Sequence, residues 1–125
     1  MPDLEAYFRG LADKTRLRIV NLLLAGELCV CDIQRILRAS QSGVSRHLTY
    51  LKHAGLVQDV RNGTRVVYSL TPADTPQLEA LREFLHKACP AEEVLQSDLR
   101  SFECAVREGR CRLGGKTLRQ EGGTE

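Results

Sequence analysis

The sequence has no run of about 18 apolar residues, the length with which a helix spans a membrane. Its first residues, Met-Pro-Asp-Leu-Glu, also lack the basic start and apolar stretch of an export signal. We therefore expect a cytoplasmic protein that does not enter the membrane. No segment is repeated, and 125 residues with 42% hydrophobic content suffice for one modest core but not for a second independent domain.

The chain also has little net charge, only +2, but its basic residues are concentrated. Between positions 35 and 65 there are six basic residues and one acidic residue, Asp59. The six are Arg35, Arg38, Arg46, Lys52, Arg61 and Arg65. A basic segment beside an acidic remainder is typical of a nucleic-acid-binding face.

Hydrophobic periodicity predicts a mainly α-helical protein with one small β-hairpin. Helices are expected over 3–12, 15–25, 30–38 and 41–54, and two later helices carry the stripes Leu78/Leu81/Leu85 and Leu95/Leu99/Phe102/Val106. The hairpin is expected around Arg61-Asn62-Gly63-Thr64, where Asn-Gly favours a type I′ turn. We expect residues 1–108 to form the domain and residues 109–125, rich in glycine and charge, to form a disordered tail.

The segment 41–54 has one apolar and one polar side, as in a helix that lies in the major groove of DNA. Ser40 is placed to cap this helix, and Arg46 could donate two hydrogen bonds to guanine. The candidate DNA contacts are Ser40, Gln41, Ser42, Ser45, Arg46, His47 and Thr49, with Arg61 and Arg65 of the hairpin beside the duplex backbone. A polar row of this kind is by itself more often a solvated face. The preceding short helix and the following basic hairpin favour a winged helix-turn-helix.

Five cysteines are an odd number, and in a reducing compartment they indicate thiols for ligation or redox chemistry. The spacing from Cys29 to Asp32 is that of a capping box, but cysteine is a poor helix cap, so the Cys29/Cys31 pair suggests chemistry. The helix N-terminus should lower the thiol pKa. Positions two apart on a regular helix point about 200° apart, so we expect a shared ligand to unwind the first turn.

Four segments in order resemble the ArsR/SmtB family of metal-responsive repressors over roughly residues 4–88. They are ELCVCDI at 27–33, SQSGVSRHL at 40–48, LKHAGLV at 51–57 and the Asn62-Gly63 wing. The resemblance implies a homodimer on a palindromic operator in double-stranded DNA, released when As(III) or Sb(III) binds the Cys-Val-Cys thiols, and no enzymatic activity. The implied dimer interface contains Leu4, Tyr7, Phe8, Leu11, Leu78, Leu81 and Leu85.

The sequence departs from many arsenic sensors of this family at Gln34, where they carry a third cysteine. Three alternatives follow: sensing by two thiols, completion by Cys89, Cys104 or Cys111, or selectivity for a methylated arsenical with two open positions. The zinc site of related members is not expected, because Asp74-Thr75-Pro76 and His86-Lys87-Ala88-Cys89 lack its ligand pattern.

Two rival interpretations use the same cysteines. A low-pKa thiol pair is also oxidisable, so the repressor could sense oxidants or persulfides instead. Cys104 and Arg110 have the spacing of an arsenate-reductase loop, but such a loop follows a buried strand, whereas these residues follow a helical pattern that includes the acidic Glu108. Cys89 continues an apolar stripe and is expected to be a small buried residue.

Overall fold

The computed structural model describes residues 3–109, which form six α-helices, a short 3₁₀ turn and three strands. In chain order these are α1 (Leu4–Leu11), α2 (Lys14–Ala25), β1 (Leu28–Cys29), α3 (Val30–Leu37), α4 (Gln41–His53), β2 (Val57–Asn62), β3 (Arg65–Leu70), α5 (Pro76–Ala88), η1 (Cys89–Ala91) and α6 (Glu93–Arg107). The expected fold class, mainly α with a small β-hairpin, is confirmed. The expected tail lies outside the described residues except for Gly109. Within 3–109, no helix combines the length and apolarity needed to cross a membrane.

Side-chain caps fix where four of the helices begin. Asp3, Asp13, Ser40 and Thr75 each accept a hydrogen bond from the backbone N–H three residues later, at 3.0 to 3.2 Å. Each bond satisfies a donor that the first helical turn leaves unpaired. The sequence prediction for Ser40 is therefore confirmed.

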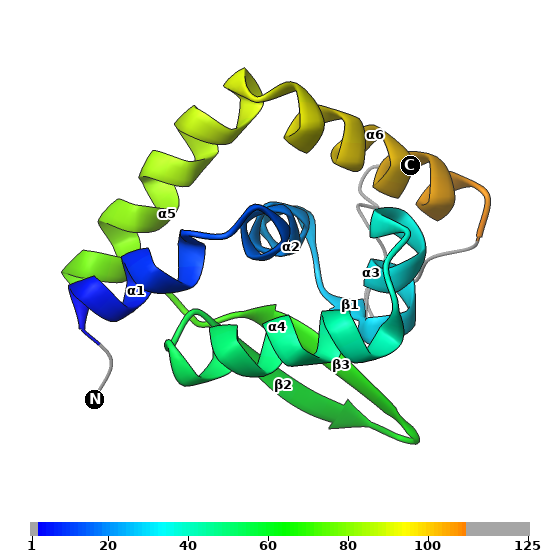
Figure 1. Cartoon of the computed structure of the whole chain (residues 1–125), viewed down its shortest axis with the longest axis horizontal. Coiled ribbons are helices and arrows are strands. Elements are labelled where there is room, and N and C mark those ends of the chain that lie inside the picture. Colours follow the sequence, from blue (N-terminus) through cyan, green and yellow to red (C-terminus); the bar gives the residue numbers. More distant parts are fainter. Residues whose placement is uncertain (1–2, 110–125) are drawn as a thin grey trace.

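Helix α2 runs through the middle of the molecule, with α5 and α6 arched over one side and α3, α4 and the sheet on the other (Figure 1). The core around it includes Ile19, Leu22, Leu48 and Phe102, all with 0% exposure. Two polar contacts fasten α6 to α2: Asn21 donates to the Leu95 carbonyl at 3.0 Å, and Arg18 pairs with Asp98. These contacts fix the position of α6 over the central helix α2.

The sheet has the order β1-β3-β2 with antiparallel pairing, so it contains one more strand than the hairpin predicted from sequence. The added strand β1 pairs Cys29 with Val67. The expected type I′ turn is wrong: Asn62 pairs with Arg65, so the two loop residues are Gly63 and Thr64, and of these only Gly63 has a positive φ, 70°. Glycine at the first loop position fits a type II′ turn, which gives the same strand twist.

Candidate thiol site and nucleic-acid interface

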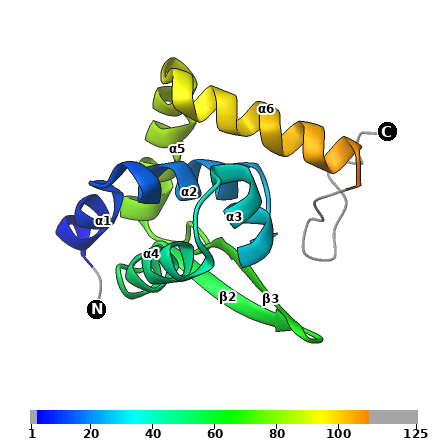
Figure 2. The ribbon, with the colours of Figure 1, turned by 45° about the vertical axis from the view of Figure 1, so that its right-hand side comes forward.

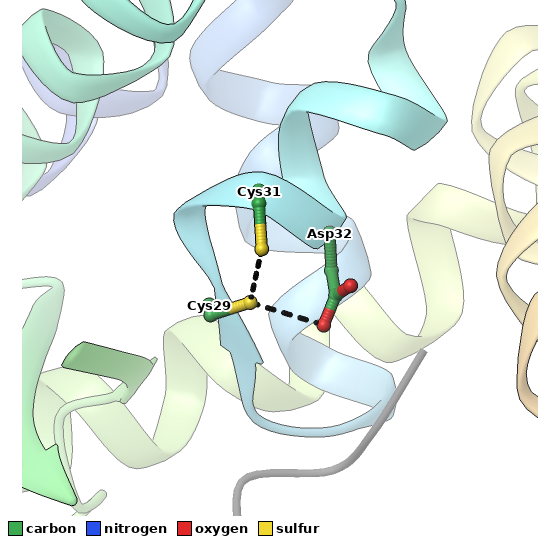
Figure 3. Close-up of side chains that lie close together, drawn as sticks. All are labelled: Cys29, Cys31 and Asp32. Atoms are coloured by element: carbon green, nitrogen blue, oxygen red, sulfur yellow. Dashed lines mark hydrogen bonds between the residues drawn. The ribbon is translucent and has the colours of Figure 1, made fainter. Parts of the chain in front are cut away.

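Cys29 and Cys31 bring their sulfur atoms to 3.0 Å of each other at the start of α3 (Figure 3). The Cys29 thiol also donates a hydrogen bond to Oδ2 of Asp32 at 3.2 Å. Two sulfurs and one carboxylate oxygen thus lie within 4.8 Å of one another, close enough to bind a single atom. Soft sulfur donors favour soft, thiol-seeking metals and metalloids.

The two sulfurs converge because Cys29 is not part of the helix. It is the N-cap residue of α3 with extended backbone (φ −86°, ψ 166°) and also the last residue of β1, whereas Cys31 lies in the first turn. The premise of the unwinding expectation, that the two thiols point about 200° apart, is therefore wrong for the observed backbone. The capping-box expectation also fails, since the Cys29 side chain makes no capping hydrogen bond and its thiol faces Asp32 and Cys31.

Asp32 is the charged centre of the site, with an exposure of only 2%. Its carboxylate pairs with Arg35 at 3.1 Å and with Arg65 of β3 at 3.7 Å. Arg65 also donates a hydrogen bond to the Cys29 sulfur at 3.0 Å, and this contact, with the negative charge of Asp32, raises the pKa of Arg65. Two guanidinium groups compensate the buried carboxylate, which would otherwise be costly to desolvate.

The thiol pKa does not follow the expectation from the helix N-terminus. The hydrogen bond with Cys29 and burial raise the pKa of Cys31, because both favour the protonated thiol over an additional negative charge. The two sulfurs therefore share a site that disfavours two simultaneous thiolates, despite the nearby Arg35.

The remaining cysteines within 3–109 lie apart from this cluster. Cys89 is buried in the core, as expected, and burial raises its pKa. Cys104 is half-buried on α6 and donates to Glu108 at 3.2 Å. Cys111 and Arg110 lie outside the described residues, and the segment before Arg110 is the helix α6, not the buried strand that an arsenate-reductase loop needs.

Helix α4 exposes most of the row that the sequence predicts for DNA contact. Gln41, Ser42, Arg46 and Thr49 are exposed, and Ser45 is half-buried. Ser40 is exposed but its hydroxyl oxygen already accepts the Gly43 N–H. His47 is half-buried against Arg16, at 3.5 Å, and Arg16 stacks on the Tyr50 ring at 4.0 Å, so α2 contributes a cation that was absent from the predicted set of contacts.

The β2–β3 hairpin projects away from the helices as a wing (Figure 2). Arg61 is exposed on β2, where a basic side chain can reach a phosphate backbone. Arg65, expected in the same role, instead directs its guanidinium to the thiol site. The register of β3 that brings Arg65 to the thiol site could not be predicted without knowing that β3 pairs with β1.

The residues expected at a dimer interface fall into two groups. Tyr7, Leu78, Leu81 and Leu85 are buried in the core of the chain itself, because α1 and α5 pack onto the central helix with these sides. Leu11 also packs against this core. Leu4 and Phe8 are 48% and 53% exposed, and Phe84, absent from the prediction, is 59% exposed. Leu4, Phe8, Ala80 and Phe84 line an apolar groove of about 730 Å³, which we call the α1–α5 face.

Comparisons with known proteins agree with this architecture. Residues 13–59 match the arsR family of bacterial regulatory proteins. A cadmium resistance transcriptional regulatory protein CadC homolog from Staphylococcus aureus is 40% identical over 86 residues, which are 68% of this chain and 70% of the relative. The arsenical resistance operon repressor of Escherichia coli K12 is 52% identical over 66 residues, 52% of this chain and 56% of that protein.

A solved structure shares the fold. The homodimeric winged helix-turn-helix DNA-binding domain of Mb0332 from Mycobacterium bovis superposes with a TM-score of 0.57 at 32% identity, over 66% of this chain and 77% of that domain. The winged helix-turn-helix expected from sequence is thereby confirmed.

Proposed function

The chain belongs to the arsR family of bacterial regulatory proteins, and we propose that it is a homodimeric repressor whose operator is released when As(III) or Sb(III) binds to Cys29 and Cys31. It is a transcriptional regulator and not an enzyme. The observation that carries the proposal is the 3.0 Å approach of the two sulfurs. A repressor of this kind acts in the cytoplasm, where its DNA is.

The donor set fits a trivalent arsenical. Each thiol displaces one hydroxide from As(OH)₃ and gives it a proton, so that two As–S bonds form and two water molecules leave without any change of oxidation state. The third position on arsenic keeps its hydroxide, or a methyl group in a methylated arsenical. Asp32, already engaged by Arg35 and Arg65, supports the site as a hydrogen-bonded neighbour of Cys29.

For DNA binding, we assign α4 to the major groove and Arg61 to the duplex backbone. Gln41, Ser42, Arg46 and Thr49 present short polar groups and one guanidinium on one exposed row, which suits contacts with base edges and phosphates. Two such helices in a two-fold dimer read a palindromic operator.

The dimer would form through the α1–α5 face. Its exposed phenylalanines and Leu4 form an apolar patch that a soluble monomer rarely presents to water. A second copy related by a two-fold axis covers the same patch on both molecules.

One observation also favours a second candidate, the sensing of oxidants. Two thiols at 3.0 Å can lose two hydrogens to a peroxide, which becomes two water molecules while a disulfide forms between Cys29 and Cys31. The same repressor would then respond to peroxide rather than to a metalloid.

An operator duplex is first selected from random DNA by its binding to the protein and is then fluorescently labelled. The test measures the fluorescence anisotropy of this duplex while arsenite is titrated into the complex in the presence of a phosphine reductant. We expect release of DNA from the wild type and from the matched variant C89S, and no release from C29S or C31S. Release from C29S at the same arsenite concentration as the wild type would overturn the proposal. Release by hydrogen peroxide in a separate titration without reductant, with arsenite ineffective, would establish the second candidate instead.

A further inference from the structure

Arg65 connects the thiol site to the wing. It is the first residue of β3, directly after the Gly63-Thr64 turn, and it pairs across the hairpin with Asn62. Its guanidinium reaches back to the Cys29 sulfur at 3.0 Å and to Asp32 at 3.7 Å. A single side chain thus spans from the wing to the start of α3, where Figure 3 shows the sulfurs and the carboxylate together.

The contact to Cys29 depends on the state of its sulfur. A free thiol or thiolate has lone pairs that accept the Arg65 N–H, and charge makes such a bond stronger. When a ligand replaces the thiol proton of Cys29, the hydrogen bond from that thiol to Oδ2 of Asp32 is lost, and the freed carboxylate oxygen draws Arg65 away from the sulfur. Arg65 then keeps only its contact to Oδ2 of Asp32, whose other oxygen, Oδ1, pairs with Arg35 at 3.1 Å.

We infer that Arg65 is the residue through which the thiol site controls the wing: its bond to Cys29 holds the wing in the DNA-binding arrangement, and occupation of the sulfurs releases it. The inference rests on the proposed function and replaces unwinding of α3 as the link, because the first turn of α3 already accommodates both sulfurs. A single bistable contact is sufficient for coupling between two sites. Arg65 is therefore a positioning residue, whereas Arg61 is a DNA contact.

The experiment measures the operator Kd with and without saturating arsenite in the wild type, R65Q, R65K and the neighbouring control R61Q. Arsenite binding is measured separately by calorimetry. The coupling factor is the operator Kd with arsenite divided by the operator Kd without it, and such factors are typically about 5- to 150-fold. We expect R65Q still to take up arsenite in calorimetry, but its arsenite-free operator Kd should already be weakened toward the value of the arsenite-loaded wild type, so that its coupling factor falls toward 1. R65K should also lose coupling, because an ammonium lacks the forked donors that reach both Cys29 and Asp32.

R61Q should weaken the operator complex equally with and without arsenite, so that its coupling factor stays at the wild-type value. A wild-type coupling factor in both R65Q and R65K, with arsenite bound, would overturn the inference and leave the proposed function intact. A wild-type protein that binds arsenite without any change in operator Kd would refute the proposed function and, with it, this role of Arg65.

Discussion

Arg18 on α2 and Asp98 on α6 form a two-point ion pair across 80 positions of sequence, with N–O distances of 2.8 and 2.9 Å. Asp98 is almost fully buried, and its hydrogen bonds with Arg18, together with its charge, raise the pKa of Arg18. The pair holds α6 over the central helix and so fixes the frame on which α3, with its thiol site, is mounted.

Removal of one partner from this pair should be strongly destabilising. D98A leaves the Arg18 guanidinium without its carboxylate, and breaking a buried pair costs about 3–5 kcal/mol of unfolding free energy. Urea denaturation followed by circular dichroism measures this loss of unfolding free energy. R100A, which breaks the exposed Arg100–Glu93 pair at 3.3 Å, is the matched control and should cost at most about 1 kcal/mol. Equal losses of unfolding free energy in D98A and R100A would show that the buried pair stabilises the fold no more than the exposed one.

The cap of α2 gives a pH-dependent stability. The backbone N–H of Arg16 lowers the pKa of Asp13 below its ordinary value of 3.8. A lowered folded-state pKa means that this stabilisation is complete above the ordinary value and disappears as the pH falls through the lowered one. D13N keeps a good cap but has no charge to lose. The wild type should therefore lose more stability than D13N between about pH 7 and about pH 2.5, measured by urea midpoints; parallel losses would contradict this role of Asp13.

Arg46 and Arg61 should affect DNA binding differently. R46A should weaken the operator complex by about 1–3 kcal/mol and relax sequence preference, because Arg46 is placed to contact a base. R61A should weaken binding to all DNA and reduce the salt slope of log K by about 1, since one phosphate contact is lost. Anisotropy titrations over a salt series measure both. An unchanged salt slope in R61A would argue against the wing as a backbone contact.

The α1–α5 face predicts the oligomeric state. F84E places a charge on a surface that would be covered in the dimer, so sedimentation velocity should show a monomer at concentrations where the wild type is a dimer. V60E is the matched control: Val60 is 56% exposed on the wing, outside the α1–α5 face, and its replacement should leave the dimer intact. If the F84E protein is still a dimer, the dimer interface does not include the α1–α5 face.

The helices were largely predictable because their signals are local. Caps such as Ser40 and the spacing of Leu78, Leu81 and Leu85 act over a few residues, and the four helices predicted with bounds agree with the observed ones to within one residue at each end. The spacing of these leucines also indicated that one side of α5 is buried, but not which surface packs against it. The stripe packs on the same chain, and Phe84 on the neighbouring side of α5 is exposed.

The thiol geometry was not predictable from local rules. A two-residue strand such as β1 has no measurable periodicity, yet it makes Cys29 an extended residue and aligns it with β3. Both the convergence of the sulfurs and the approach of Arg65 follow from that non-local pairing. The sequence identified the pair as chemically unusual, and only the fold shows how the sulfurs face each other.

We propose that Cys29 and Cys31 together bind one trivalent arsenic atom. Arsenic K-edge X-ray absorption of the arsenite-loaded protein counts the sulfur neighbours directly. We expect two sulfur neighbours and one oxygen neighbour in the wild type, and the loss of this signature in C29S. Three sulfur neighbours, or two that persist in C29S, would contradict it.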